Sequence, residues 1–148
     1  MRFAHINIVA KDPERLSQFY VRVFRCTPKP PERRLSGSWL DRATGLKSAK
    51  LKGVHLLLPG HGPQGPTIEI FQYRDRVDSE LKMANHTGFT HMAFEVEDVQ
   101  RTFDEAMKNG AEPLGKIAER SVEGVGFLSF VYLRDPEGNI VEIQSWKP

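Results

Sequence analysis

Cysteine, long apolar runs and a signal-like N-terminus are all scarce or missing in this sequence. Its single cysteine, Cys26, excludes an internal disulfide and a thiolate metal cluster, which is typical of proteins from a reducing compartment. No apolar stretch approaches the roughly 18 residues that a membrane-crossing helix needs. The N-terminus also lacks a basic region followed by an apolar one. We therefore expect a cytoplasmic protein with no membrane partner, in which Cys26 is a buried, unreactive thiol.

An excess of charge of either sign is missing as well. The 148 residues carry 21 basic and 19 acidic side chains, and the resulting formal charge of +2 is spread along the chain without a basic run. This pattern argues against nucleic acid as a partner. The chain also lacks a phosphate-cradling glycine-rich loop, a nucleophile elbow and a C-x-x-C motif, so no organic cofactor is predicted. With 39% hydrophobic residues, it has the composition of an ordinary globular domain.

What the sequence does contain is an internal repeat. A shift of 86 residues aligns AHINIVAKDPER with THMAFEVEDVQR, which places His5 on His91 and Asp12 on Asp98. Each segment has the pattern of a strand, an aspartate at a helix N-cap and an amphipathic helix. The two copies also end alike, in strand, Gly/Pro turn and strand. We predict an α+β fold, with a single domain over residues 1–148 that consists of two tandem βαβββ modules at about residues 1–80 and 86–148.

Each copy contains one predicted helix. The first begins at Pro13, which suits the opening position of a helix, and the second ends near Gly110, a residue suited to a C-terminal cap. Apolar residues at helical spacing predict the face that each helix buries. These residues are Leu16, Phe19, Tyr20, Val23 and Phe24 in the first helix and Val99, Phe103, Ala106 and Met107 in the second.

The stretch from residue 27 to residue 48 departs from the repeat. Its prolines argue against a continuous helix, and Trp39 and Leu40 supply apolar surface without a clear periodicity. Two interpretations remain open, a surface loop whose Trp39 packs on the core and a flap that closes over a site.

Polar side chains interrupt the apolar strands of both copies. In a strand, alternate side chains share a face, so His5 and Asn7 are expected on the concave side of the sheet, away from the helix. His91 takes the place of His5 in the second copy, and Glu69 and Glu142 each lie between two apolar residues of a final strand. An ionised carboxylate in such a strand costs several kcal/mol unless it is paired or coordinates a cation.

Two histidines and two glutamates, one of each per copy, are a set suited to a divalent metal ion. Imidazole nitrogen and carboxylate oxygen are ligands of nickel, cobalt, zinc, manganese and iron. The four residues are distant in sequence, so they meet only if the two modules bring their strands together. Each residue taken singly has an alternative role, as an exposed edge residue or in a satisfied hydrogen bond of the core. Among the other histidines, a surface or core position is expected for His55, and exposure for His61 and His86.

These residues resemble those of the vicinal oxygen chelate superfamily, which includes glyoxalase I, methylmalonyl-CoA epimerase, extradiol dioxygenases and the fosfomycin and bleomycin resistance proteins. The similarity lies in the H-x-x-x-x-x-x-D-x-x-R openings at His5 and His91, the GFTHMAFEV strand and the DPEGNIVEIQ ending. It implies paired βαβββ modules whose curved mixed sheets enclose one divalent metal ion, and a homodimer. The implied metal ligands are His5, Glu69, His91 and Glu142.

The ligand set also indicates a branch of that superfamily. Its iron oxygenases and fosfomycin enzymes typically use two histidines and one glutamate, whereas a set with two glutamates resembles the isomerase and lyase members, glyoxalase I in particular. The resemblance does not extend to glutathione. Where glyoxalase I binds the glutathione carboxylates with two arginines and an asparagine, this chain has Val9, Tyr73 and Thr87.

We therefore expect a metal-dependent isomerase, epimerase or lyase that acts through an enediolate on a small oxygenated substrate of the α-hydroxy-carbonyl type. Glu142 and Glu69 are the expected catalytic bases, and Asn7, Gln144 and Trp39 are the expected substrate-binding residues. Two alternatives remain, an Fe(II) ring-cleaving dioxygenase and a metal-free protein that binds a drug or metabolite.

Overall fold

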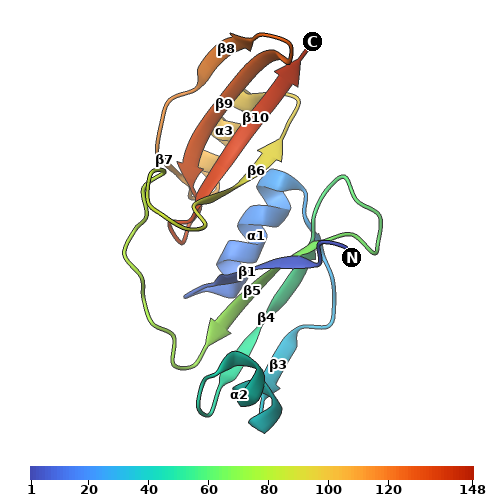
Figure 1. Ribbon diagram of the computed structural model, residues 1–148, viewed down its shortest axis with the longest axis vertical. Coiled ribbons are helices and arrows are strands. Elements are labelled where there is room, and N and C mark those ends of the chain that lie inside the picture. The colour runs from blue at the N-terminus through green and yellow to red at the C-terminus, as the bar shows by residue number, and fades with distance from the viewer. The chain divides into compact units, whose positions relative to one another are not determined.

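The computed structural model describes residues 1–148, which divide into two compact units, Met1–Ser79 and Glu80–Pro148 (Figure 1). Each unit contains one five-stranded mixed sheet. The charge of the two units differs strongly, because the first has 14 basic and 7 acidic residues and the second has 7 and 12. Their formal charges are therefore +7 and −5. The expectation that charge is spread along the chain is therefore wrong for the separate units. The net charge of +2 is the sum of an excess of positive charge in the first unit and of negative charge in the second.

In the first unit, the strand order of the sheet is β1-β5-β4-β2, and β3 also pairs with β4. β1 and β5 are parallel, while the other pairs are antiparallel. The elements are β1 (His5–Val9), α1 (Pro13–Phe24), β2 (Thr27–Pro28), β3 (Arg33–Ser36), α2 (Ser38–Thr44), β4 (Lys50–Leu57) and β5 (Thr67–Tyr73).

The second unit repeats this plan, with strand order β6-β10-β9-β7 and with β8 paired to β9. β6 and β10 are the parallel pair. The elements are β6 (His91–Glu95), α3 (Val99–Lys108), β7 (Glu112–Pro113), β8 (Ala118–Val122), β9 (Gly126–Arg134) and β10 (Ile140–Lys147). The predicted α+β fold with a repeated strand-helix-strand order is confirmed, and each sheet has one strand more than expected because of the two-residue strands β2 and β7.

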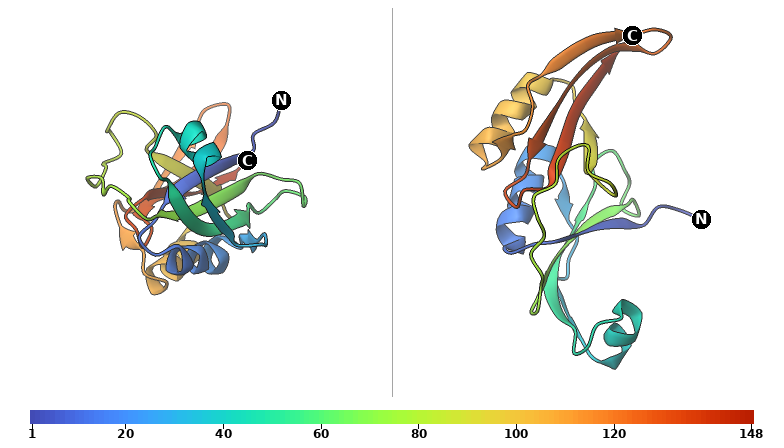
Figure 2. Two further views of the ribbon diagram at one scale, coloured as in Figure 1. Left: turned by 90° about the horizontal axis from the view of Figure 1, so that it is seen from below. Right: turned by 60° about the vertical axis from the view of Figure 1, so that its left-hand side comes forward.

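The two main helices begin and pack as the sequence indicates. The side chain of Asp12 accepts a hydrogen bond from the backbone N–H of Arg15 at 3.0 Å, and Asp98 does the same for Arg101 at 2.9 Å, so each aspartate caps its helix. α1 packs on β4 and β5, and α3 lies along one face of the second sheet, against β9 and β10 (Figure 2). All five predicted residues of α1 are buried, but in α3 only Val99 and Ala106 are fully buried. Neither these helices nor α2 could span a membrane.

The stretch from 27 to 48 is more regular than predicted, since it contains two strands and the helix α2. Leu40 is buried in a cluster with Ala49, Leu51 and Phe71, whereas the neighbouring Trp39 remains 51% exposed. The interpretation in which Trp39 packs on the core is therefore wrong. Consecutive residues of a helix point in different directions, and the carboxylate of Asp41 fixes the orientation of α2 by accepting hydrogen bonds from the backbone of Ser48 and Ala49.

Candidate functional site

His5 and Glu69 lie on one face of the first sheet. β1 and β5 are parallel neighbours, and their register sets Asn7 beside Glu69, so His5 is two residues away on the same face. The Nδ1 atom of His5 is 3.5 Å from Oε1 of Glu69. The Glu69 side chain is only 15% exposed. The structure thus brings together the first histidine and glutamate that the sequence indicates.

The second unit repeats this pair on β6 and β10. Glu142 lies beside Ala93, so the offset between His91 and Glu142 equals that between His5 and Glu69. His91 Nε2 is 3.1 Å from Glu142 Oε2, and the Glu142 side chain is 13% exposed. Thr90 Oγ1 is 3.2 Å from His91 Nδ1 and orients the ring. Each unit therefore carries one imidazole facing one largely buried carboxylate.

A third residue joins each pair from the neighbouring antiparallel strand. His55 on β4 is directly opposite Glu69, and Tyr132 on β9 is directly opposite Glu142. His55 Nε2 is 3.5 Å from Glu69 Oε1. The expectation of an ordinary surface or core histidine at position 55 missed this contact. The signal that could have found it is the hairpin, because strand pairing across the turn sets the two residues side by side.

The surroundings of His55 and Tyr132 shift the pKa of each side chain. Burial lowers the pKa of His55, and the positive charges of Arg33 and Lys29 act in the same direction against the opposing effect of Glu69. His55 is therefore neutral near pH 7 and presents one N–H donor. Burial raises the pKa of Tyr132, and both the charge of Glu142 and a hydrogen bond with it add to this effect. The phenol stays protonated and donates to the carboxylate.

The expected substrate-binding residues occupy different positions. Asn7 shares the face of Glu69, and its Nδ2 is 3.5 Å from the backbone carbonyl oxygen of that residue. Gln144 shares the face of Glu142, and its Oε1 accepts a hydrogen bond of 3.3 Å from Nε1 of Trp146, a residue that sequence reasoning missed. Trp39 lies on α2, is half exposed and is distant in sequence from the residues of both pairs.

The donors of the two pairs fit a divalent metal ion. Each largely buried carboxylate faces imidazole, and neither Glu69 nor Glu142 forms an ion pair with lysine or arginine. Two nitrogens and two oxygens suit the divalent transition metals named above. The structure does not itself gather three or more such side chains into a metal-binding group. His61 and His86 are exposed, as expected.

Comparison with solved structures finds the same fold in several proteins. A glyoxalase family protein from Bacillus cereus superposes with a TM-score of 0.84 at 20% identity, over 100% of this chain and 95% of that one. The fosfomycin resistance protein FosX from Listeria monocytogenes superposes with a TM-score of 0.61 at 18% identity, over 99% and 94%. A further structure of FosX, in complex with Mn(II) and sulfate, gives a TM-score of 0.56 at 16% identity, over 99% and 93%.

Sequence comparison agrees with the fold. No curated protein sequence matches this chain. A family model, however, matches residues 2–143, which is nearly the whole chain, and the match includes all four residues of the two His–Glu pairs. The resemblance drawn from the sequence motifs is confirmed, and the chain belongs to the glyoxalase/bleomycin resistance protein/dioxygenase superfamily.

Proposed function

We propose that this protein is a divalent-metal-dependent isomerase, epimerase or lyase that acts on a small oxygenated substrate. The observation that carries the proposal is the repeated pair, in which each unit directs one imidazole at one largely buried carboxylate from matching positions of its sheet. Carboxylates withdrawn from water in apolar strands require a cation or a hydrogen-bond partner. Retention of this arrangement in both halves supports a role in binding and chemistry.

The two pairs, His5 with Glu69 and His91 with Glu142, would supply the ligands of the proposed divalent metal ion. Such an ion, when bound, polarises a carbonyl oxygen of the substrate and so acidifies the neighbouring C–H group. The metal-bound state of FosX with Mn(II), a protein of the same fold, is compatible with a divalent ion in this family. Nickel, cobalt, zinc, manganese and iron all remain candidates.

Glu142 and Glu69 are the proposed bases, and each would take or return a proton at a carboxylate oxygen. The hydrogen bond from Tyr132 orients the Glu142 carboxylate, while His5 and His55 hold Glu69. Asn7 and Gln144 lie on the faces that carry these glutamates and would orient the substrate. Proton transfer by a positioned side chain contributes roughly 100-fold to 10,000-fold to a rate.

The substrate proposed here is not a glutathione conjugate. Val9, Tyr73 and Thr87 stand in place of the two arginines and the asparagine that would bind the glutathione carboxylates. Each missing charge-assisted hydrogen bond would cost on the order of 1.5–3 kcal/mol of binding. An α-hydroxy-carbonyl compound without these carboxylates makes no such demand.

Metal analysis of the untreated protein tests the first part of the proposal. We expect one equivalent of a divalent metal per chain, with a large loss in Glu69→Gln and Glu142→Gln and full retention in the control Glu14→Gln, an exposed residue of α1. Incorporation of solvent deuterium into hydroxy-ketones, 2-oxoaldehyde adducts and acyl-CoA esters tests the second part. A protein that binds no metal yet still binds small molecules would instead be a drug- or metabolite-binding protein.

A second candidate is an Fe(II) ring-cleaving dioxygenase, and the contact between His55 and Glu69 favours it. If His55 keeps Glu69 away from the metal, the remaining ligands are two histidines and one glutamate, and coordination positions stay open for oxygen and substrate. Anaerobic loading with Fe(II), followed by measurement of oxygen uptake with catechols, separates the two candidates. Uptake that persists in Glu69→Gln would support the dioxygenase.

A further inference from the structure

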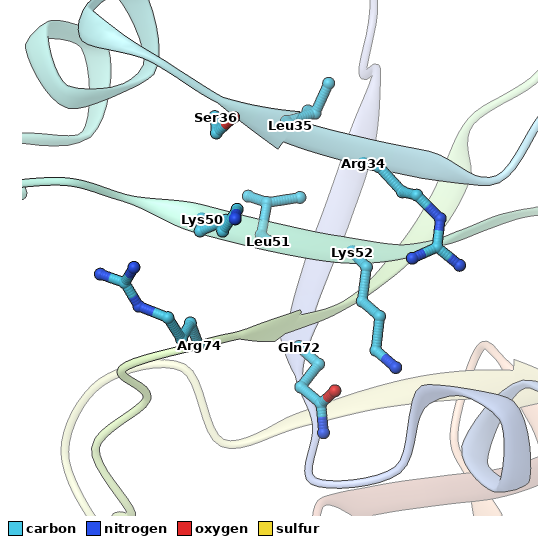
Figure 3. A pocket seen from close by; sticks show the side chains of 8 residues that line it. All are labelled: Arg34, Leu35, Ser36, Lys50, Leu51, Lys52, Gln72 and Arg74. Atoms are coloured by element: carbon cyan, nitrogen blue, oxygen red, sulfur yellow. The ribbon is translucent and has the colours of Figure 1, made fainter.

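A groove with four cationic side chains lies on the first unit, apart from the His–Glu pair (Figure 3). It is open to solvent and has a volume of about 380 Å³. Its polar side chains come from the adjacent strands β3, β4 and β5 and from the residue after β5. They are Arg34, Ser36, Lys50, Lys52, Gln72 and Arg74.

Strand register places these side chains on one face. Arg34 is opposite Lys52, and Lys52 is opposite Gln72, so the three form one row across the strands. Ser36 and Lys50 begin a second row, which continues to Arg74 because the backbone N–H of Arg74 donates to the carbonyl of Lys50 at 2.9 Å. Residues directly opposite one another project to the same side of a sheet. Both rows are visible in Figure 3.

This face is not the one that carries Glu69. Side chains alternate along β5, so Glu69 and Phe71 point to one side and Gln72 to the other. α1 covers Ile68 and Ile70 farther along the groove's side of the sheet. The groove therefore lies next to the part of the sheet that α1 covers. Binding in the groove does not depend on the proposed function.

Like charges lie next to one another in the groove. Arg34 and Lys52 are like charges directly opposite each other, which destabilises a sheet. No carboxylate lines the groove. Lys50 and Lys52 form no ion pair in the structure.

The two arginines have carboxylate partners only outside the groove. Arg34 is 3.3 Å from Glu32, and Arg74 is 2.6 Å from Asp75. The two lysines remain without an acidic partner, and they are part of a unit whose formal charge is +7. A sheet that gathers cations in this way has a net attraction for anions.

We propose that this groove binds a small phosphate-bearing anion. The guanidinium group of Arg34 offers paired N–H donors that match a phosphate, the two lysines add point charges, and the Ser36 hydroxyl adds a neutral donor. The amide nitrogen of Gln72 donates to the carbonyl of Lys11, which fixes that wall of the groove. No aromatic side chain lines the groove, so it lacks the stacking surface with which proteins bind single-stranded nucleic acid.

Titration of the full-length protein with inorganic phosphate, by calorimetry at constant ionic strength, tests the proposal. We expect saturable binding to the wild type. The double variant Lys50→Gln/Lys52→Gln should bind at least tenfold more weakly, and Ser36→Asp, which adds a negative charge, should lose binding too. The matched control Lys116→Gln/Lys147→Gln removes two exposed lysines of the second unit and should bind as the wild type does. Glu69→Gln should also bind phosphate as the wild type does. Phosphate bound at the proposed metal centre would instead be lost in this variant, so the variant distinguishes the two locations.

Three results would overturn the proposal. The first is the absence of saturable binding to the wild type beyond the effect of chloride at the same ionic strength. The second is equal affinity of the wild type and of both groove variants, with folding checked by circular dichroism. The third is binding of a labelled single-stranded oligonucleotide, but not of phosphate, in a manner that requires Lys50 and Lys52.

Discussion

His55 lies directly opposite Glu69 in the register of β4 and β5, and its Nε2 is 3.5 Å from Oε1 of that glutamate. His5 lies on β1, the neighbour of β5 on its other side, and its Nδ1 is also 3.5 Å from Oε1 of Glu69. Both imidazoles thus face one oxygen of Glu69, a residue that would hold the proposed metal ion together with His5. His55 would then fix the carboxylate in the orientation that the metal requires, as residues behind a metal ligand commonly do.

The variant His55→Leu tests this role. If Glu69 binds the metal, loss of the His55 contact should weaken metal affinity by roughly tenfold, because the carboxylate is no longer held in place. Competition with a chromophoric chelator measures the affinity. The control is His61→Leu, which changes an exposed histidine of a turn and should leave metal affinity unchanged. Unchanged or tighter binding in His55→Leu would contradict this role and favour the dioxygenase candidate, in which His55 keeps Glu69 off the metal.

The variant Tyr132→Phe tests the corresponding contact in the second unit. It keeps the ring that packs 5.0 Å from His91 and 5.9 Å from Phe130, and it removes only the phenol group that donates to Glu142. We expect a loss of about 1 kcal/mol in the free energy of unfolding, the usual value of one hydrogen bond. Urea unfolding measures this change.

The rate of deuterium exchange into a substrate should fall about tenfold in Tyr132→Phe, because Glu142 loses a partner that orients it. Tyr73→Phe is the matched control, since Tyr73 packs against the apolar cluster of α2 and not against a glutamate of the pairs. Equal exchange rates in Tyr132→Phe and the wild type would show that the phenol does not assist Glu142.

The repeat explains why so much of the fold and of the two pairs follows from the sequence. Period-two and period-3.6 patterns indicate the strands and helices, and a polar residue that recurs at matching places in two copies is distinguished from an accidental one. His55 and Tyr132 carried no such signal, because different residue types occupy the matching place. Their contacts arise from strand register, which the GVHLLL pattern does not define since it lacks alternation.

The orientation of α2 could not be predicted from the sequence, whereas the charge distribution could. Which of Trp39 and Leu40 is buried depends on the rotation of a two-turn helix. The hydrogen bonds that the Asp41 carboxylate accepts from the backbone before β4 set that rotation. The separation into charges of +7 and −5 already follows from the predicted module boundary near residue 80, because a charge count for each module reveals it. The orientation of α2 thus depends on contacts between segments that sequence periodicity does not relate.

The reactivity of Cys26 should be very low in the folded protein. The thiol is 2% exposed, and burial raises its pKa from an ordinary value of 9.0 to about 12. Alkylation by iodoacetamide at pH 8 should therefore be slow until the protein is unfolded in urea, as mass spectrometry can measure. Rapid modification of the native protein would contradict the burial of this residue.

The same pKa shift predicts a dependence of stability on pH. The folded protein retains the Cys26 proton more strongly than the unfolded chain, so this stabilisation is complete below pH 9.0 and is lost as the pH rises toward about 12. At pH 10.5 the loss should reach about 2 kcal/mol relative to pH 8. Urea unfolding of the wild type and of Cys26→Ala at both values measures it, because the variant lacks this contribution. Parallel changes in the two proteins would contradict the prediction.

Substitutions at Leu40 and Trp39 should separate the structural role of α2 from a functional one. Leu40→Ala removes a buried side chain from the cluster with Leu51 and Phe71, and we expect a loss of about 2–4 kcal/mol in the free energy of unfolding. Trp39→Ala removes a side chain that is 51% exposed, so its effect on stability should be well below that of Leu40→Ala. If Trp39 closes over the substrate, its variant should instead raise KM while the protein stays stable. A Trp39→Ala protein with normal stability and normal KM would show that this residue has no part in binding.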